Sequence, residues 1–387
     1  MSAMNRTTLE HEEFREYVQA LLSTGNNSDV LKALLTLDVP QPYRVRTKVI
    51  YSPESPIDVL QQAAIDRDRV NRLAENADSF TYSEVTGRIK PKRVDVPFFV
   101  ASFDEQDSIS SRVQVIISVC TSSQWDVLSR LIKSLYPQLV PILLSQSELI
   151  EGAKKLRQLS GHEVRVRSLS AKERLDGSGN KARKSIRAWT DEQLEEVFRG
   201  IEERGQVLTY LEVEFFPRVG EHSHVVPKAT CKIRKTGEIE VTGSLELAFD
   251  AVAKAVARQG EKKLRHYSGR GLRQANYRPR PLAINFPNRI FDDLEVVRGF
   301  VRLLSSYPRS MHAVEHGNPY AHVKITDLYD YSAFEVWAVP PSRIALIPGL
   351  KASEAAFERL VHHIFDGFKE GQVVEYERSG RATAESA

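Results

Sequence analysis

The chain has 387 residues, of which 41% are hydrophobic and 27% are charged, as is typical of a globular protein that buries a sizeable core. Its net charge is +3, and its two cysteines, Cys120 and Cys231, are too few to hold a zinc cluster alone. The apolar runs at 113–120 and 139–144 are far shorter than a membrane span, and acidic residues occupy the N-terminal stretch where a signal peptide needs an apolar core. We therefore expect a cytoplasmic protein that makes no membrane contact.

The first 160 residues predict an N-terminal α/β module with a helical start. Apolar residues recur at helical spacing in some segments and alternate in others, which predicts helices and strands respectively. The expected helices cover 9–37, 55–77, 122–136 and 145–159, and the expected strands cover 43–52, 93–103 and 111–120. In helix 122–136 one face carries Trp125, Leu128, Leu131, Ile132 and Leu135. Ser145 and Glu148 have the spacing of a capping box at the start of the next helix.

The remaining chain predicts two β-sheet-plus-helix units separated by basic segments. We expect a basic linker at 161–189, a first unit at 190–258, a basic Arg/Tyr loop at 259–281, a second unit at 282–377 and a disordered tail at 378–387. The first unit begins with a helix at 190–205 and a strand at 206–216. The predicted fold class is therefore a multidomain protein of the α/β and α+β classes.

The two units share a rhythm of strand, turn, strand, glycine and helix. "KATCKIRKTGEIEVTGSLELAFDAVAKAV" covers 228–256, and "FEVWAVPPSRIALIPGLKASEAAFERLVHHIF" covers 334–365. Their junctions align with an offset of 106, which places Gly243 on Gly349, and their helices align with an offset of 108. Buried helix positions are then expected at Val252, Val256, Leu360 and Ile364. Two such units, side by side, can continue one sheet whose far face stays open, although a chance likeness of two ordinary segments is the alternative.

This pattern resembles a half-repeat of the TATA-box-binding protein, over residues 205–365 at most. Gly237 and Gly243 match that family's turn and strand-end positions, whereas Arg343 and Pro348 depart from it in the second unit. The resemblance implies a saddle-shaped sheet with helices on its convex side. The family's phenylalanine wedges correspond here to Arg234 and to a proline, Pro340, so kinking of a minor groove is not expected.

Positive charge is concentrated in two segments of the chain. Residues 154–189 contain eleven Lys/Arg and three acids, and residues 258–280 contain eight Lys/Arg and one acid. Since the whole chain carries +3, the rest of it carries −12. This distribution favours a polyanionic partner, and the alternative is a pair of loops whose cations pair with the acidic body.

The segment 258–281 interleaves cations with rings that can stack on bases, as in proteins that bind single strands. The strand at 229–234 adds a face that carries Thr230, Lys232 and Arg234, opposite to Cys231 and Ile233. The predicted nucleic-acid contacts are Lys181, Arg183, Lys184, Arg187, Lys232, Arg234, Lys262, Lys263, Arg265, His266, Tyr267, Arg270, Arg273, Tyr277, Arg278 and Arg280.

Three functions are compatible with these patterns. The first is a non-enzymatic protein that binds DNA or RNA, as an accessory component of a DNA-processing or antiviral defence assembly, a context that rests on no particular residue. The second is an interaction or assembly subunit, because "SRIALIPGL" at 342–350 is apolar on both faces. The third is a metal-dependent nuclease or phosphodiesterase that uses His222, His224, His312 and His316. We expect the first, with no catalytic residue, no metal and no cofactor.

Overall fold

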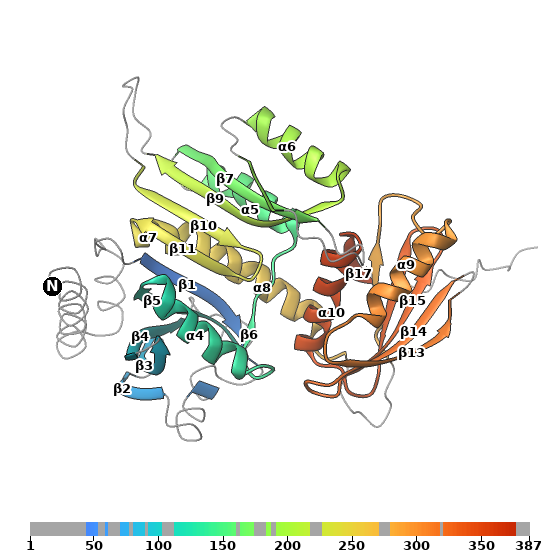
Figure 1. Ribbon diagram of the computed structural model, residues 1–387, viewed down its shortest axis with the longest axis horizontal. Coiled ribbons are helices and arrows are strands. Elements are labelled where there is room, and N and C mark those ends of the chain that lie inside the picture. The colour runs from blue at the N-terminus through green and yellow to red at the C-terminus, as the bar shows by residue number, and fades with distance from the viewer. Residues whose placement is uncertain are drawn as a thin grey trace, which may run out of the picture. The chain divides into compact units, whose positions relative to one another are not determined.

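The computed structural model of the protein describes residues 44–52, 59–60, 70–76, 80–89, 92–102, 112–159, 163–173, 183–186, 191–216, 227–270, 279–317 and 320–376. The chain divides into two compact units, and the main division falls after Lys262, inside a helix. Figure 1 draws the first unit mainly in blue to yellow and the second mainly in orange to red. Within the described ranges, no helix is long and apolar enough to span a bilayer.

The first unit contains an 11-stranded antiparallel sheet, called sheet A. Its strand order is β2-β3-β4-β5-β1-β11-β10-β9-β7-β8, and β6 pairs with β1. The strands are β1 (Arg44–Tyr51), β2 (Val70–Asn76), β3 (Phe80–Ile89), β4 (Lys92–Ser102), β5 (Val113–Cys120), β6 (Val140–Pro141), β7 (Glu163–Glu173), β8 (Arg183–Ile186), β9 (Gln206–Phe216), β10 (Ala229–Arg234) and β11 (Glu238–Gly243). The accompanying helices are α4 (Ser122–Ser134), α5 (Gln146–Leu159), α6 (Asp191–Glu203), α7 (Leu245–Ala248), the π-helical turn η2 (Phe249–Ala253) and α8 (Lys254–Tyr267).

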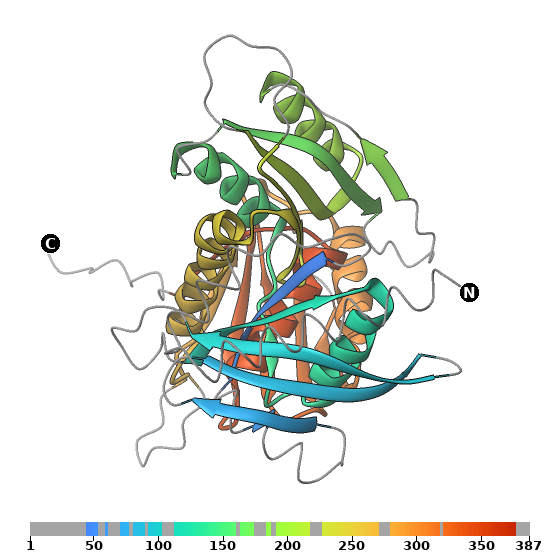
Figure 2. The same ribbon diagram turned by 90° about the vertical axis from the view of Figure 1, so that its left-hand side faces the viewer.

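Helix α4 covers one face of the N-terminal half of sheet A. Thr121 forms a capping box with Gln124 at the first turn of the helix. Trp125 and Leu128 lie in one hydrophobic cluster with Phe98 of β4 and with residues of β5. Figure 2 shows α4 alongside the cyan strands β3 and β4. The helix predicted at 122–136, with its apolar face, is confirmed.

The start of α5 follows the predicted pattern as well. The hydroxyl of Ser145 accepts a hydrogen bond from the backbone N–H of Glu148 at 3.1 Å. The Glu148 carboxylate accepts one in return from the backbone N–H of Ser145 at 2.7 Å. This reciprocal pair is a capping box, which satisfies two of the N–H groups that a helix start leaves without partners.

Three segments differ from the sequence prediction. Residues 70–76 were expected to end a helix, but they form β2 and pair with β3. The expected linker 161–189 contains β7 and β8, which pair with each other. The expected loop 259–281 is helical as far as Tyr267. In the first two cases cross-strand pairing outweighs a weak local preference, which is common for strands. The predicted boundaries at 160 and 189 both lie inside the first unit. Strand β1 pairs with β11, which joins the N-terminal part of the chain to the hairpin that follows these boundaries.

The hairpin of β10 and β11 leads into α7 and α8. Cys231 and Ile233 are buried on the side of the hairpin opposite to Lys232, as the alternation predicts. Gly243 ends the hairpin with a φ of +90°, and a Cβ at this position would lie 2.3 Å from the carbonyl oxygen of Lys228. Only glycine accepts both this conformation and this close approach.

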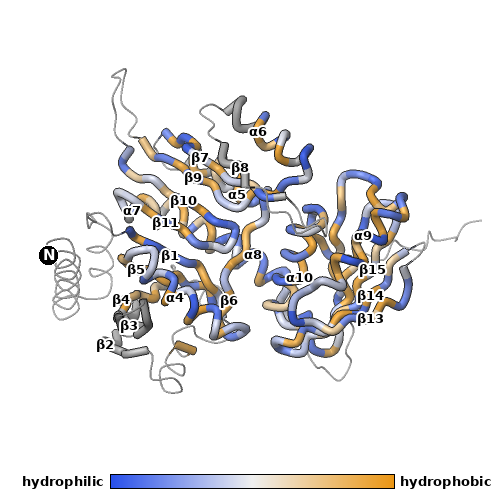
Figure 3. The backbone as a smooth tube through the Cα atoms, in the orientation of Figure 1, coloured by the Kyte–Doolittle hydropathy of each residue, from blue (hydrophilic) through white to orange (hydrophobic). Residues whose placement is uncertain are grey.

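The second unit contains a six-stranded antiparallel sheet, called sheet B, with the order β13-β14-β15-β16-β12-β17. Its elements are β12 (Leu282–Asn285), α9 (Leu294–Ser305), β13 (Ser310–His316), β14 (Ala321–Asp327), β15 (Ala333–Val339), β16 (Arg343–Pro348), α10 (Glu354–Gly367) and β17 (Gln372–Glu375). Phe300 of α9 and Phe357 of α10 share one hydrophobic cluster with Val323, Val336 and other inward residues of the sheet. Hydrophobic and hydrophilic stretches alternate along α9, as a helix with one face on a sheet requires (Figure 3).

A buried polar network joins the β14–β15 turn to α10. Asp327 is fully buried, and it accepts a hydrogen bond from the Tyr307 hydroxyl at 2.9 Å and pairs with Arg359. Burial raises the pKa of Tyr307. In the same turn Asp330 accepts a hydrogen bond from Ser353, the N-cap residue of α10. The turn and the start of α10 are therefore held together by charge-assisted hydrogen bonds.

The same strand order occurs twice along the chain. The first run is β1 to α4, with the order β2-β3-β4-β5-β1, and the second is β12 to α10, with the order β13-β14-β15-β16-β12. In each run the first strand lies beside the last one, and the hairpin of the second and third strands contains a register shift. The units predicted to continue one sheet lie instead in two sheets, because β11 pairs with β1. The predicted burial of Val252, Val256, Leu360 and Ile364 is confirmed.

Candidate nucleic-acid interface

Several residues predicted to contact nucleic acid lie on helix α8, and their side chains pack against or pair with other parts of the protein. Tyr267 was expected to stack on bases, but it is 4% exposed and its ring is stacked on Phe357 with 5.5 Å between ring centroids. Lys263 pairs with Glu358 at 3.3 Å, and His266 is half-buried. Helix formation brings these side chains inward because every third or fourth residue of a helix shares a face. The prediction of a base-stacking role for Tyr267 is therefore corrected to a role in the core.

Arg270 is the second correction. Its side chain is 1% exposed, and it donates hydrogen bonds to the backbone carbonyls of His266 and Arg280, at 2.5 and 2.9 Å. Its guanidinium also forms a two-pronged pair with the carboxylate of Glu375, which lowers the pKa of that carboxyl. A guanidinium that is buried and engaged with so many acceptors inside the protein is not available to a phosphate.

The cations that remain exposed near α8 form a stripe. Arg258, Lys262 and Arg265 are exposed and stand at i, i+4 and i+7, on one side of the helix. Arg280 is exposed just before β12. The predicted contacts Arg273, Tyr277 and Arg278 lie outside the described residues, as do Lys181 and Arg187. Arg183 and Lys184 lie on β8, whose backbone alone is described.

The predicted basic face of β10 is present, but neighbouring strands neutralise it. Opposite Lys232 stand Glu240 on β11 and Glu212 on β9, and opposite Glu240 stands Arg46 on β1. Cations and anions thus alternate across four strands, and this row is called the charge ladder. Arg234 pairs with Glu238 at 3.2 Å and with Glu240 at 3.8 Å. Opposite charges on facing positions stabilise a sheet, and they leave little net field for a polyanion.

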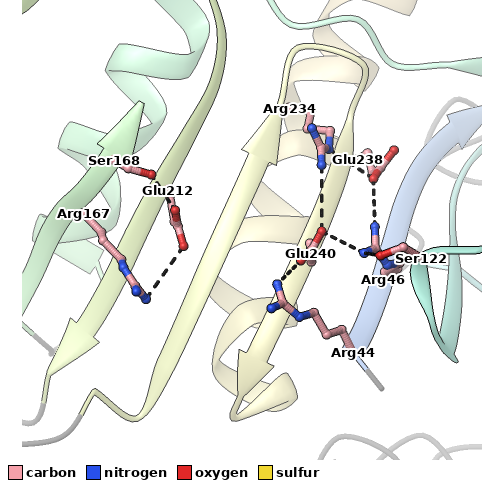
Figure 4. A network of polar contacts seen from close by, with 9 residues as sticks. All are labelled: Arg44, Arg46, Ser122, Arg167, Ser168, Glu212, Arg234, Glu238 and Glu240. Carbon is pink, nitrogen blue, oxygen red and sulfur yellow. Dashed lines mark hydrogen bonds and ion pairs between the residues drawn. The ribbon is translucent and has the colours of Figure 1, made fainter. Parts of the chain in front are cut away.

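Figure 4 shows three members of the charge ladder, Arg46, Glu212 and Glu240, together with their polar partners. Arg46 reaches Glu240 at 3.0 Å and also donates to the hydroxyl of Ser122 at 2.9 Å. At the other end, Glu212 accepts from Ser168 at 2.5 Å and lies 3.9 Å from Arg167. Lys232 lies over the ring of Tyr210 at 3.9 Å. The predicted contacts Lys232 and Arg234 are therefore held by the sheet itself.

A different surface gathers stacking chemistry, on the face of sheet B opposite to α9 and α10. Residues that are directly opposite on antiparallel strands share a face, and His322, Trp337, Ala345 and Ala283 form one such row across β14, β15, β16 and β12. The inward neighbours of these residues belong to the hydrophobic core, so the row points away from the two helices. Trp337 is half-buried in this position.

The rings of this face form a continuous series. His322 stacks on Trp337 with 3.9 Å between centroids and an interplanar angle of 18°. Tyr320 stacks on the same indole at 6.0 Å and 12°, and His316 lies 5.2 Å from Tyr320. These four residues, His316, Tyr320, His322 and Trp337, are called the aromatic platform. The rings of His322, Trp337 and Tyr320 are nearly parallel, whereas His316 is tilted by 49° to Tyr320. Because His322 is buried, a further planar group can stack only on the exposed or half-buried rings of the series.

A β-bulge places His316 in the platform. Along β13, His312 pairs with Ile325 and Val314 with Val323, both of which are core residues of β14. The register shifts after Val314, so that His316 pairs with His322 and joins the opposite face. An extra residue in one strand of a pair turns the following side chain to the other side, and such bulges often adjoin functional sites.

Polar groups surround the platform. Arg343 donates to the side-chain oxygen of Asn285 at 2.9 Å, and its guanidinium lies 5.9 Å from the Tyr376 ring. The exposed Lys324 pairs with Glu315 at 3.2 Å. Glu335 lies 3.2 Å from Nε2 of His322. Cations and carboxylates are thus present in similar number, so stacking rather than net charge distinguishes this surface.

The indole N–H of Trp337 is notable within the platform. This nitrogen is inaccessible to solvent and has no hydrogen-bond acceptor among the described residues. A buried donor without an acceptor costs free energy, typically about 1–3 kcal/mol.

The platform was not among the residues predicted to bind nucleic acid. Its signal is the alternation of "AHVKITD" and "AFEVWAV", which sets His322 and Lys324 on one side of their strand and Glu335 and Trp337 on one side of theirs. His312 and His316, proposed as metal ligands, fall on opposite faces of β13, and His222 and His224 lie outside the described residues. Within the described part of the chain, no group of three or more His, Cys, Asp or Glu side chains is placed to hold a metal ion.

The apolar segment 342–350, proposed as a partner-binding surface, is mostly used within its own unit. Ile344 and Leu346 lie in the core under the two helices, and Ala345 lies in the row beside Trp337. Leu350, at 57% exposure, extends beyond the sheet. Comparison with known proteins gives no guide to this surface, because no protein-family model and no curated protein matches the chain.

Proposed function

We propose that this protein is a non-enzymatic nucleic-acid-binding protein whose aromatic platform holds single-stranded DNA or RNA. The observation that carries the proposal is the continuous series of rings on one face of an antiparallel sheet. Every nucleobase has two flat faces, so an aromatic platform binds unpaired bases with little dependence on sequence. Duplexes hide these faces, which makes the single strand the expected ligand.

The groups around the platform support the same ligand. Arg343 and Lys324 can meet phosphates, and Asn285 can meet base edges. Because Glu315 and Glu335 offset these cations, binding on this face should depend only weakly on salt, unlike binding through a basic patch.

We also propose that residues 205–365 contain two units that resemble halves of the TATA-box-binding protein. The proposal rests on the strand–turn–strand–helix pattern at 228–267 and 333–367. The family's wedge positions hold Arg234 and Pro340, so the platform, and not a wedge, is the proposed contact. Participation in a DNA-processing or defence assembly stays a prediction.

The test is a binding titration with fluorescent single-stranded DNA and RNA oligonucleotides. Trp337→Ala should weaken binding by about 1–3 kcal/mol, which is roughly 5- to 150-fold, because one stacked base loses its support. The matched control is Tyr331→Ala, which removes an exposed ring of the same unit, outside the platform. Both variants should keep the far-ultraviolet circular dichroism of the parent.

Three results would overturn the proposal. The first is a parent protein that binds neither single-stranded DNA nor single-stranded RNA at low salt. The second is equal loss of binding in Trp337→Ala and Tyr331→Ala, since the platform would then have no special part. The third is a preference for neutral oligosaccharides over oligonucleotides, because aromatic platforms stack on sugar rings as well.

A further inference from the structure

We propose that the edge strand β13 joins two copies of this chain by antiparallel pairing, with His312 of one copy opposite His312 of the other. Strand β13 is one of the two terminal strands of sheet B, so its outer backbone groups face no neighbouring strand of that sheet. Six of its seven residues are exposed, including the apolar Met311 at 60% and Val314 at 46%. Exposed apolar side chains on a sheet edge are the usual mark of a strand that pairs with another chain.

The sequence of β13 lacks the features that block such pairing. Natural edge strands carry lysine, proline or an inward charge, whereas "SMHAVEH" has no cation other than histidine and no proline. Its single acid, Glu315, pairs with Lys324 of the neighbouring strand. One of the two terminal strands of sheet A differs, because β8 has the sequence "RKSI". The bulge after Val314 interrupts only the last part of β13.

The register follows from symmetry. A two-fold axis perpendicular to the sheet leaves the platform side of both copies on one side of the joined sheet. Each β13 residue therefore stands opposite a residue of the second copy whose side chain points to the same face. The regular part of β13, from Ser310 to Val314, overlaps itself completely only when His312 lies on the axis. Met311 then meets Ala313 on the side of the platform, and Ser310 meets Val314 on the helix side. No pair of carboxylates or of lysines is brought together.

The occupant is a second copy and not an unrelated strand, because this register is self-complementary. It covers exposed Met311 and Val314 in each copy with small or apolar partners. The paired stretch is short, about 17 Å for five residues, and interfaces of this size give weak, reversible dimers. Pairing would extend sheet B into the sheet of the second copy and set the two aromatic platforms on one common face.

The experiment uses a charge exchange on the two-fold axis. Sedimentation equilibrium of the parent should show a monomer–dimer equilibrium that shifts with protein concentration. His312→Glu and His312→Lys should each be monomeric at concentrations where the parent dimerises, because like charges face each other across the axis. An equimolar mixture of the two variants should dimerise again, since opposite charges then meet.

The control variant is Lys351→Glu, which changes an exposed charge on the loop before α10, and it should dimerise as the parent does. A parent that stays monomeric at every concentration overturns the proposal. So do charge variants that dimerise with the parent's affinity, or a mixture that fails to restore the dimer. A mixture that fails to restore the dimer would point to another surface, and a monomeric parent would leave the edge to a strand from another protein. Because the readout is oligomeric state, it is independent of nucleic-acid binding.

Discussion

The faces of the two sheets use their polar and aromatic residues in opposite ways. On sheet A, Lys232 stands opposite a carboxylate on each neighbouring strand, and Arg234 pairs with Glu238 of the next strand. On sheet B, Trp337 meets other rings, and its N–H meets no acceptor among the described residues. Charge along one strand therefore says little until the neighbouring strands are known. The outer ring of an aromatic stack, by contrast, can still stack on another planar group although the rings within the stack contact one another.

The largest expected effect concerns how sheet B holds its polar groups. Asp327→Ala should lower the free energy of unfolding by about 3–5 kcal/mol, because it removes a fully buried carboxylate that pairs with Arg359 and accepts a hydrogen bond from Tyr307. Urea denaturation followed by circular dichroism measures this loss. The matched control is Asp292→Ala, which removes an exposed pair with Arg289 and should cost at most about 1 kcal/mol. Similar costs for both variants would contradict the buried pairing.

The second prediction tests whether the exposed cations of α8 bind phosphates, which the neutralised cations of the charge ladder are not expected to do. Arg258→Ala combined with Lys262→Ala should flatten the salt dependence of duplex DNA binding by about one unit of log–log slope for each phosphate that is no longer neutralised. These side chains are exposed on α8, so their removal leaves the core intact. Gel shifts at several salt concentrations measure the slope. An unchanged slope would show that α8 binds no phosphate.

The third prediction tests the internal role of Arg270 through pH. Its hydrogen bonds depress the pKa of Glu375, so the folded state binds a proton less readily than the unfolded state does. The stabilisation is complete above the ordinary glutamate pKa near 4.5 and is lost as the pH falls through the lower folded value. The difference in melting temperature between the parent and Glu375→Gln should accordingly shrink from pH 7 towards pH 3. A constant difference would rule out this ionic contribution.

The smallest effect is expected for the cations of sheet A that neighbouring carboxylates already neutralise. Lys232→Ala combined with Arg234→Ala should leave the affinity for single strands and the salt slope unchanged, because the carboxylates of the charge ladder already offset both cations. The Arg258→Ala/Lys262→Ala variant, which also removes two cations, is the control for the change in salt slope. A clear loss of binding in the Lys232/Arg234 variant would restore the basic strand as a binding surface.

Local signals in the sequence were sufficient to predict features that depend only on residues within one element. The capping box of Ser145 and Glu148 and the apolar face of α4 depend on residues three or four apart, and both are confirmed. Strand β2 was predicted as helix because "VNRLAEN" has no strong strand preference, and its pairing with β3 decides the outcome. The fold class was predictable only coarsely, as two antiparallel sheets with helices.

The candidate site shows the same limit. Tyr267 and Arg270 have the residue types of a nucleic-acid contact, but burial against Phe357 and pairing with Glu375 depend on partners about ninety to a hundred residues away. The platform needs four residues from three strands and a connecting segment, and the bulge that turns His316 is invisible in the sequence. The alternation of β14 and β15 was the available signal.

The place of β1 in sheet A has a consequence for how the protein is made. Its residue Val45 pairs with Val119 on one side and with Val241 on the other. A chain leaving the ribosome presents β1 first, and that strand must keep one edge unsatisfied until β11 has been synthesised. At about 5–20 residues per second, this wait lasts roughly ten to forty seconds. During that interval the nascent edge needs protection, so translation speed or a chaperone should influence the yield of folded protein more than the stability of the finished sheet does.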